Sequence, residues 1–300
     1  MPEHFADRLL AAIEKKSSPV CVGLDPVYDR LPEDLKRKFN REFDGQIEAI
    51  KSFCLTLLEL SAPYVPVVKP QSAYFEVYGY LGVAAYEACV DRARELGLVV
   101  IGDVKRNDIG STAAAYAQGH LNNGPGSPDG VTVNGYLGRD GITPFIEQAT
   151  VEGKGLFVLV RTSNPSAREL QDLEVKDGRK VYEHMAALVA SLGAGSVGAC
   201  GYSNVGAVVG ATYPDEARAL RQLMPQQLFL VPGYGAQGGT AADAAASFKA
   251  DGTGAIVNAS RSVIFAYNEK QYAGTDWKHA IESAAKAFAK DIATAVKRTA

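Results

Sequence analysis

Short apolar runs rich in β-branched residues recur along the chain, and segments with helical spacing of apolar residues separate them. The runs predict eight β-strands, at residues 20–25, 65–69, 99–105, 130–134, 156–161, 205–210, 228–231 and 254–258. The helical patterns include residues 76–96, 141–151, 181–192 and 276–297. Ahead of the first strand, Phe5, Leu9 and Ile13 lie on one stripe of an amphipathic N-terminal helix.

The alternation of strands and helices predicts parallel strand pairing through right-handed crossovers. Eight such units close naturally into a (β/α)8 TIM barrel of the α/β class. An open doubly wound sheet is the alternative, but no G-x-G-x-x-G motif follows the first strand, which argues against its dinucleotide-binding version. No linker or change of composition divides the chain, so we predict a single barrel domain over residues 1–300 with an N-terminal helix.

Charge and composition limit which partners the protein could bind and in which cellular compartment it is expected. The formal net charge of −3 gives no electrostatic basis for binding nucleic acid or a membrane surface. No apolar run approaches the roughly 18 residues that a membrane span needs. The 4 cysteines are scattered without metal-ligand spacing and are expected to be reduced core residues. We therefore expect a cytoplasmic protein.

The third predicted strand changes abruptly from apolar to charged residues at its end. Side chains alternate along a strand, so Asp103 and Lys105 are expected on the same side. Buried charges are tolerated only when they are paired, hydrogen-bonded or functional. A structural ion pair would explain Asp103 and Lys105 alone, but a further charge at Asp108 favours chemistry.

Other predicted strands also end in polar residues. The first strand ends at Asp25, the second at Lys69, and the fifth is followed by Thr162, Ser163 and Asn164. Each of these could be a solvated loop residue if taken alone. In a barrel, however, the C-terminal strand ends converge on one mouth, where active sites are built. Opposite charges placed side by side at one mouth predict an active site whose chemistry depends on charged side chains.

A phosphate site is predicted after the last two strands. Residues 232–240 form a glycine-rich loop before a helix, so backbone N–H groups and a helix terminus can approach an anion. Arg261 follows the eighth strand and offers a guanidinium. A plain turn would explain the glycines alone, but loops after strands seven and eight usually hold phosphate in such barrels.

Metal and nucleophile signals are weak. The 4 histidines fall in helical or loop stretches and form no H-E-x-x-H motif. Ser163 has no histidine nearby in the sequence and no nucleophile-elbow pattern. We therefore expect chemistry based on lysine and carboxylates, with no metal and no bound cofactor.

Residues 103–109, D-V-K-R-N-D-I, resemble the D-x-K-x-x-D-I signature of orotidine 5'-phosphate decarboxylases. Five further segments resemble that family and occur in the same order along the chain, at residues 22–26, 69–71, 162–165, 232–239 and 259–262. The chain length and the Lys-Pro-Gln and Val-Asn-Gly-Tyr segments are similar to the longer bacterial branch.

The resemblance implies decarboxylation of orotidine 5'-monophosphate to UMP, a step of de novo pyrimidine biosynthesis, by a metal- and cofactor-free homodimeric barrel. It implies that Lys105 protonates C6 and that Asp103 lies beside the substrate carboxylate. Asp108, with Ile109 beside it, would reach into the site of the partner subunit. Lys69 would join the charge network as a catalytic residue.

The resemblance also implies a set of substrate-binding residues. Asp25 would bind the ribose together with Lys69, and Ser163 would hydrogen-bond the pyrimidine ring. Gln237 and Arg261 would hold the phosphate. The remaining members of the predicted set are Thr112, Pro232 and Ser260. Ser260 stands where the family often has glycine, which puts the backbone contact there in question.

The implied decarboxylation needs a cation and a carboxylate near C6, and these residues supply both. Loss of carbon dioxide from C6 leaves a carbanion with little resonance stabilisation, so a nearby ammonium must stabilise and protonate it. A carboxylate against the substrate carboxylate costs on the order of 4 kcal/mol at ~4 Å and an effective dielectric near 20. That repulsion is relieved as carbon dioxide leaves. Phosphate binding, remote from C6, can close loops around the ring, and residues 163–180 and 233–240 are the candidate lids.

Two other functions remain open. A related barrel decarboxylase or aldolase that acts on a sugar phosphate such as 3-keto-gulonate 6-phosphate shares the D-x-K-x-x-D core but uses Mg²⁺. A non-catalytic sensor of a phosphoribosyl ligand could have the same fold, although the intact charges at Asp103, Lys105 and Asp108 argue against it. The turn-rich insertion at residues 122–129 is expected to be a surface loop.

Overall fold

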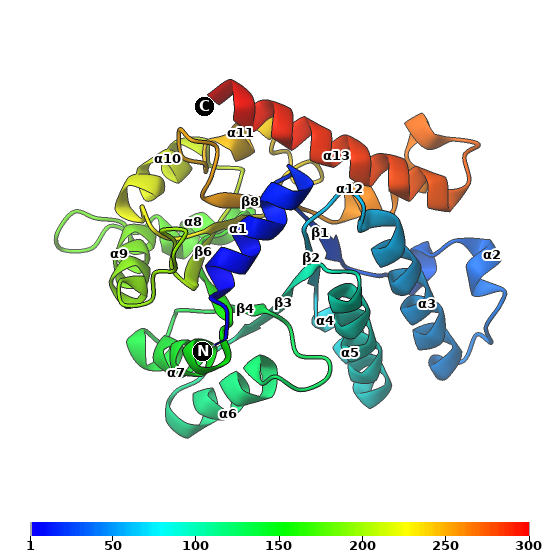
Figure 1. Ribbon diagram of the computed structural model, residues 1–300, viewed down its shortest axis with the longest axis horizontal. Helices are drawn as coiled ribbons and strands as arrows, with labels where there is room; N and C mark the ends of the chain where they lie inside the picture. Colours follow the sequence, from blue (N-terminus) through cyan, green and yellow to red (C-terminus); the bar gives the residue numbers. More distant parts are fainter. Residues whose placement is uncertain (1, 300) are drawn as a thin grey trace.

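The barrel predicted from the sequence is confirmed in the computed structural model, which describes residues 2–299. Eight parallel strands close in the order β1-β2-β3-β4-β5-β6-β7-β8, and helices surround them (Figure 1). The strands are β1 Val20–Leu24, β2 Val67–Pro70, β3 Val99–Arg106, β4 Gly130–Val133, β5 Gly155–Arg161, β6 Val205–Val209, β7 Phe229–Val231 and β8 Ala255–Ala259. All eight predicted strands are present, with ends shifted by one or two residues.

The helices also follow the predicted order. The longer ones are α1 Phe5–Lys16, α3 Phe43–Ser61, α5 Gly79–Glu95, α6 Gly110–Leu121, α7 Arg139–Glu152, α9 Val181–Gly193, α10 Pro214–Leu223 and α13 Trp277–Thr299. The short ones are α2 Glu33–Lys36, α4 Ala73–Glu76, α8 Arg168–Gln171, α11 Ala241–Ala245 and α12 Arg261–Ile264, with 3₁₀ turns at Tyr28–Arg30, Pro165–Ala167, Ala266–Asn268 and Lys270–Tyr272.

One predicted helix differs. Residues 76–96 were expected to form a single helix, but α4 ends at Glu76 and α5 begins at Gly79. Gly79 has a φ of +59°, a left-handed conformation that glycine adopts easily and that interrupts a right-handed helix. The apolar spacing continues across this break, so the pattern alone did not reveal it.

The N-terminal helix closes one end of the barrel. Helix α1 lies across the strands in Figure 1, and its Phe5 ring packs edge-on against Phe157 with the centroids 6.0 Å apart. Gly155 at the start of β5 leaves room for this ring, because a Cβ there would lie 2.1 Å from Phe5. The N-terminal ends of the strands are therefore sealed, and the C-terminal ends form the mouth.

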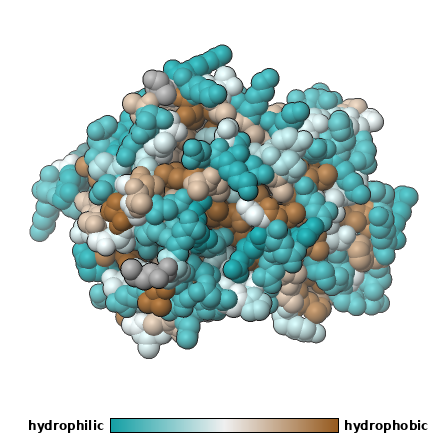
Figure 2. All heavy atoms as spheres, in the orientation of Figure 1, coloured by the Kyte–Doolittle hydropathy of each residue, from teal (hydrophilic) through white to brown (hydrophobic). Residues whose placement is uncertain are grey.

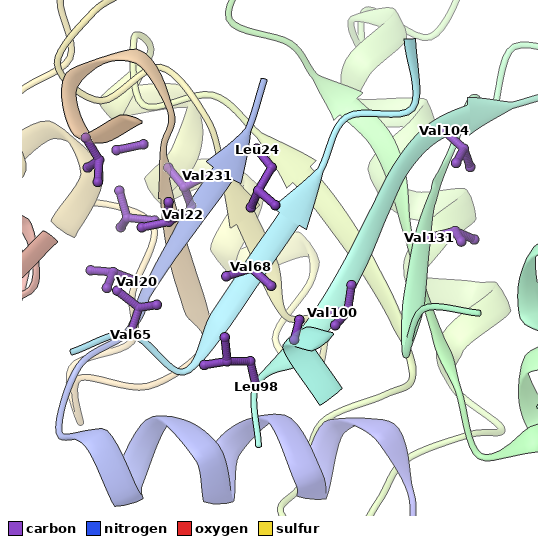
Figure 3. Close-up of a cluster of buried hydrophobic side chains, with 14 of the residues drawn as sticks. Val20, Val22, Leu24, Val65, Val68, Leu98, Val100, Val104, Val131 and Val231 are labelled. Carbon is purple, nitrogen blue, oxygen red and sulfur yellow. The ribbon is translucent and has the colours of Figure 1, made fainter. Parts of the chain in front are cut away.

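Two apolar layers hold the barrel together. Residues that point outward from the strands pack against the helices, and Figure 3 shows part of this layer, including Val22, Val68 and Val100 on three neighbouring strands. The alternate residues point inward and form a second cluster, with Val67, Ile101 and Phe157 among its members. Strands buried on both faces read as continuous apolar runs, which is why the sequence predicted them well.

The insertion at residues 122–129 is more than the surface loop expected from the sequence. Its last part, from Gly126 to Asp129, is buried. The buried ammonium of Lys154 donates hydrogen bonds to the Asn122 carbonyl at 2.6 Å, to Ser127 Oγ at 2.8 Å and to the Pro128 carbonyl at 2.8 Å. One lysine from the start of β5 thus holds the insertion against the closed end.

Figure 2 shows hydrophilic residues over most of the face that carries α1. No helix within residues 2–299 has the length and apolar character to cross a membrane. Cys21, Cys54 and Cys89 are buried, Cys200 is half-buried, and all four are free thiols.

Candidate active site

The mouth of the barrel carries a buried charge network. The inward-pointing positions that are apolar lower in the barrel become polar one step further along the strands, as in Val67 to Lys69 on β2 and Ile101 to Asp103 on β3. Lys69 is 5% exposed and Asp103 is 6% exposed. The Lys69 ammonium lies 2.6 Å from Asp103 Oδ2, and the Lys105 ammonium lies 2.5 Å from Asp103 Oδ1. The predicted pairing of Asp103 with Lys105 is therefore present.

Asp103 accepts hydrogen bonds on both of its carboxylate oxygens. Besides the two lysines, Gln71 Nε2 donates to Oδ2 at 2.9 Å and Thr132 Oγ1 donates to Oδ1 at 2.8 Å. Burial alone would raise the pKa of Asp103, but the charges and hydrogen bonds of Lys69 and Lys105 hold it well below its ordinary value. Asp103 is therefore ionised throughout the neutral pH range.

The same pair fixes the charge of Lys69. Burial would lower the pKa of its ammonium, yet the nearby carboxylates of Asp103 and Asp25 raise that pKa above its ordinary value. A buried cation and a buried anion are thus held in their charged forms by each other. The Lys105 side chain differs because it is 46% exposed and faces the open mouth.

The sequence pattern predicted a regular strand at Lys105, but the backbone there is irregular. The φ of Lys105 is +44°, in the left-handed region that residues other than glycine rarely adopt. The pairing of β3 with β4 shifts between Gly102 and Arg106, so the strand bulges there. Bulges often lie beside active sites and redirect a side chain. Lys105 thus reaches Asp103 from a bulged backbone.

A cavity of about 740 Å³ opens in front of this network. Nine of the predicted site residues line it: Asp25, Lys69, Asp103, Lys105, Ser163, Pro232, Gln237, Ser260 and Arg261. The strands divide its floor into two halves. Lys69, Asp103 and Thr132 from β2 to β4 form a charged half, whereas Leu159, Val208 and Leu230 come from β5 to β7. The cavity can therefore hold a ligand with one charged and one less polar edge.

The predicted phosphate end lies on the loops after β7 and β8. Gly233, Gly235 and Gly238 have φ values of +100°, +70° and +94°, which only glycine adopts easily. The helix after this loop, α11, has 5 residues, so its dipole is smaller than the sequence reading assumed. The Gln237 amide, the exposed Arg261 guanidinium and N–H groups of the loop are the groups that could bind an anion there.

Ser163 is held in place by two glycines. A Cβ at Gly210 would lie 3.0 Å from Ser163 Cβ, and a Cβ at Gly233 would lie 3.2 Å from it. These close approaches fix the serine between the ends of β6 and β7, where it faces the cavity.

The segment after Ser163, one of the two candidate lids, is fastened by Arg161. This guanidinium is fully buried, lies 3.9 Å from the ring centroid of Tyr213 and is 3.0 Å from Asp172. Gln171 at the end of α8 donates to Thr162 Oγ1 at 2.7 Å. The sequence analysis placed Arg161 at the end of a strand and gave it no role, and its contacts come from residues far along the chain.

Three predicted residues lie outside the cavity. Asp108, Ile109 and Thr112 are not among the residues that line it. Asp108 Oδ1 accepts a hydrogen bond from the Ile109 N–H at 2.8 Å, at the start of α6. Ile109 is 55% exposed. Within one chain, therefore, none of these three predicted residues contacts the cavity.

Sequence reasoning missed several polar residues of the cavity, among them Gln71, Thr132 and Asn258. Gln71 directly follows Lys69-Pro70, and Thr132 and Asn258 occupy inward positions of β4 and β8. Asn258 is 8% exposed, and its Oδ1 has no hydrogen-bond partner among the described residues. Extending the period-two alternation of each strand to its end would have found Thr132 and Asn258.

Across residues 2–299, no group of three or more His, Cys, Asp or Glu side chains could hold a metal ion. The polar groups of the cavity are instead ammonium, guanidinium, amide, hydroxyl and carboxylate groups, which suit an anionic organic ligand.

Comparison with known proteins assigns the family. Residues 18–275 match the model of the orotidine 5'-phosphate decarboxylase / HUMPS family. The orotidine 5'-phosphate decarboxylases of Rhodopirellula baltica and Clostridium perfringens are 43% and 41% identical, over 93% and 92% of this chain and 96% of each relative. The structure of Leishmania donovani OMP decarboxylase superposes with a TM-score of 0.76 at 30% identity, covering 98% of this chain and 99% of that one. This chain therefore belongs to the orotidine 5'-phosphate decarboxylase / HUMPS family.

Proposed function

We propose that this protein decarboxylates orotidine 5'-monophosphate to UMP in pyrimidine biosynthesis and needs neither a metal nor a cofactor. The observation that carries the proposal is the network at the mouth, in which one ionised carboxylate, Asp103, lies between Lys69 and Lys105 beside a cavity of about 740 Å³. The names of the relatives support the same substrate.

In the proposed reaction Lys105 is the proton donor. The bond between C6 and the carboxylate breaks, carbon dioxide leaves, and the electron pair stays on C6. The Lys105 ammonium, which is open to the cavity, stabilises this charge and transfers a proton to C6. Lys105 then regains its proton from water, so the enzyme returns to its starting state.

Asp103 has the second role. A substrate carboxylate placed at C6 beside Asp103 meets a negative charge that cannot be neutralised easily, because its pKa is held well below its ordinary value. Repulsion between the two carboxylates is relieved when carbon dioxide departs. Lys69 keeps Asp103 ionised and fixed, with 2.6 Å between the ammonium and Oδ2.

The rest of the cavity binds the remaining parts of the substrate. We assign the ribose to Asp25 and Lys69 and the pyrimidine ring to Ser163. Gln237 and Arg261, with the glycine-rich loop, take the phosphate, and Pro232 and Ser260 complete the pocket between them. Binding energy from the remote phosphate can then be used to hold C6 against Lys105.

We further propose a homodimer in which Asp108 enters the cavity of the partner subunit, with Ile109 and Thr112. Three exposed apolar side chains support this: Ile109 is 55% exposed, Tyr136 is 72% exposed and Leu137 is 45% exposed. They belong to one region, because a Cβ at Gly141 would lie 3.0 Å from the Asp108 carbonyl oxygen and 3.4 Å from Leu137 Cβ. Burying such side chains in an interface is favourable.

The substrate is tested by following the ultraviolet absorbance of orotidine 5'-monophosphate with purified protein in excess EDTA. The proposal expects rapid conversion to UMP. No conversion, together with activity on a keto-sugar phosphate that requires Mg²⁺, would assign the second function of this barrel type instead. Binding of the nucleotide without turnover of either substrate would favour the sensor function.

A further inference from the structure

Thr132 occupies an unusual position between the two groups that carry the proposed chemistry. It is 1% exposed and lies on β4 with its side chain toward the mouth. Its Oγ1 accepts a hydrogen bond from the Lys105 backbone N–H at 3.0 Å and donates one to Asp103 Oδ1 at 2.8 Å. The direction of both bonds is fixed, because an N–H can only donate and the ionised carboxylate can only accept.

The bulge in β3 explains why a side chain is needed at this point. Gly102 pairs with Val131 and Arg106 pairs with Val133, so Thr132 alone stands opposite the three residues 103–105. The Lys105 N–H bonds to the Thr132 side chain where a regular strand would use a backbone carbonyl. That bond holds the left-handed backbone of Lys105, whose φ is +44°.

The two oxygens of Asp103 consequently have different surroundings. Oδ2 is anchored by Lys69 and Gln71, both of which remain hydrogen-bond donors throughout the proposed reaction. Oδ1 accepts hydrogen bonds from the Lys105 ammonium and from the Thr132 hydroxyl. When Lys105 gives its proton to C6, Oδ1 loses an ammonium partner but keeps the hydroxyl of Thr132. The Thr132 hydroxyl therefore still donates a hydrogen bond to Asp103 Oδ1 at the step at which Lys105 has lost its charge.

We propose that Thr132 is a positioning residue that sets the placement of the Lys105 ammonium and the Asp103 carboxylate relative to each other. It does so through its hydroxyl and acts on the chemical step, with no part in binding the phosphate or the ribose. This inference rests on the proposed function, because it concerns the same proton transfer. None of the residues in the D-x-K-x-x-D-I motif supplies this contact.

Thr132→Val is the main test, because valine keeps the shape and the strand preference of threonine and removes both hydrogen bonds. We expect kcat to fall by about 100-fold, the scale of a small misplacement of a reacting group. KM and the Kd for UMP should hardly change. Thr132→Ser keeps the hydroxyl and should recover most of the rate. Thr56→Val on α3, which removes a local helix hydrogen bond far from the mouth, is the matched control and should behave like the wild type.

A second measurement does not depend on turnover. Lys105 and Lys69 can be modified with trinitrobenzenesulfonate and the extent at each followed by mass spectrometry. We expect Lys105 to react faster in Thr132→Val than in the wild type, whereas Lys69 should be unchanged. Thr132→Ala removes the same hydroxyl and gives the same prediction if the valine variant does not fold.

The outcomes separate the inference from the proposed function. If the wild type does not convert orotidine 5'-monophosphate, the proposed function fails, and the labelling of Lys105 still tests the placement. If the wild type is active, a Thr132→Val enzyme with wild-type kcat overturns the inference. So does an equal loss of rate in Thr132→Val and Thr132→Ser, because the effect would then follow side-chain shape and not the hydroxyl.

Discussion

The two ends of the barrel both bury cations, but they give them different partners. At the closed end, Lys154 and Arg221 are 3% and 5% exposed and donate to carbonyl and hydroxyl oxygens. At the mouth, Lys69 is as deeply buried and faces the carboxylate of Asp103 at 2.6 Å. Neutral acceptors satisfy hydrogen bonds without balancing the charge, whereas a carboxylate does both.

The pKa values follow this difference. Burial lowers the pKa of Lys154 to about 8 and that of Arg221 to about 10. At the mouth burial acts on Lys69 in the same direction, but the Asp103 and Asp25 charges outweigh it and raise its pKa. At the closed end Lys154 and Arg221 hold loops together, whereas at the mouth Lys69 keeps the charge of Asp103 in place. Substitutions at the closed end should therefore affect stability, and those at the mouth should affect turnover.

The largest effect is expected at the mouth, from Lys105→Ala. Because this variant removes the proton donor, kcat should fall by at least about 10⁴-fold. The side chain is half-exposed, so the fold should survive with little change in melting temperature. The ultraviolet assay and a thermal melt check both points, with Lys51→Ala on the surface of α3 as the control. Retained activity in the alanine variant would exclude Lys105 as the donor.

The next effect is expected at the closed end, from Arg221→Met. It removes the guanidinium hydrogen bonds to four carbonyl groups, those of Met224, Gln227, Ser247 and Gly254, of which Gly254 keeps a backbone donor in the Phe229 N–H. We expect the free energy of unfolding in urea to fall by about 3 kcal/mol, with kcat of the folded protein unchanged.

Arg218→Met gives the matched control on the same helix. Arg218 pairs with Asp215 at the surface, and the two side chains are 62% and 92% exposed. Its loss should change stability by less than about 0.5 kcal/mol. If the two variants were equally stable, the buried guanidinium would not hold the closed end together.

Arg261→Ala should have a smaller effect, confined to the phosphate. Loss of a charge-assisted hydrogen bond should raise KM by about 10- to 100-fold, with a lesser change in kcat. Added phosphite should restore part of the activity. Orotidine without its phosphate serves as the control substrate, because its slow turnover should be the same in wild type and variant. An unchanged KM for the phosphorylated substrate would remove Arg261 from the site.

The smallest effect is the pH dependence that Lys154 gives to stability. Its pKa is about 8 in the folded protein and close to 10.5 in the unfolded chain. Below pH 8 the lysine is charged in both states and the cost of burial is present in full. Between these values only the unfolded chain still holds the proton, so stability rises with pH.

Lys154→Met isolates this contribution. The difference in unfolding free energy between wild type and variant should rise by about 1–2 kcal/mol from pH 7.5 to pH 9. Chemical denaturation at several pH values measures it. If this difference did not change with pH, Lys154 would keep its charge in spite of its neutral partners. The proposed difference between the cations of the two ends would then be wrong.

The proposed sharing of the active site between two subunits can be tested by mixing two variants. Neither Asp108→Asn nor Lys105→Ala homodimers should be active, because each site lacks one of its charges. A mixture of the two proteins should regain part of the activity, since one site of each hybrid dimer then has both native residues. No recovery after verified subunit exchange would place Asp108 outside the active site.

Much of the barrel could be predicted from the sequence because local chemistry determines it. Parallel strands buried on both faces read as apolar runs, and their C-terminal ends converge, so Asp25, Lys69 and Asp103 were expected at one mouth. The family resemblance then supplied their expected roles.

Features that depend on long-range contacts could not be predicted. The left-handed backbone of Lys105 is hydrogen-bonded to a threonine from the next strand, and residues 122–129 are held by Lys154, which follows them by more than twenty positions. The pattern also continued through the break at Gly79, because the residues on either side keep helical spacing.

The measurement that tests the central claim most directly is proton NMR of the reaction in D₂O with excess EDTA. Wild-type protein should form UMP that carries deuterium at C6, so that the C6 proton signal is missing, and Lys105→Ala under the same conditions should form no UMP at a comparable rate, because solvent deuterium alone does not identify the donor. Orotidine 5'-monophosphate that stays unchanged, or UMP that carries hydrogen at C6, would contradict the account.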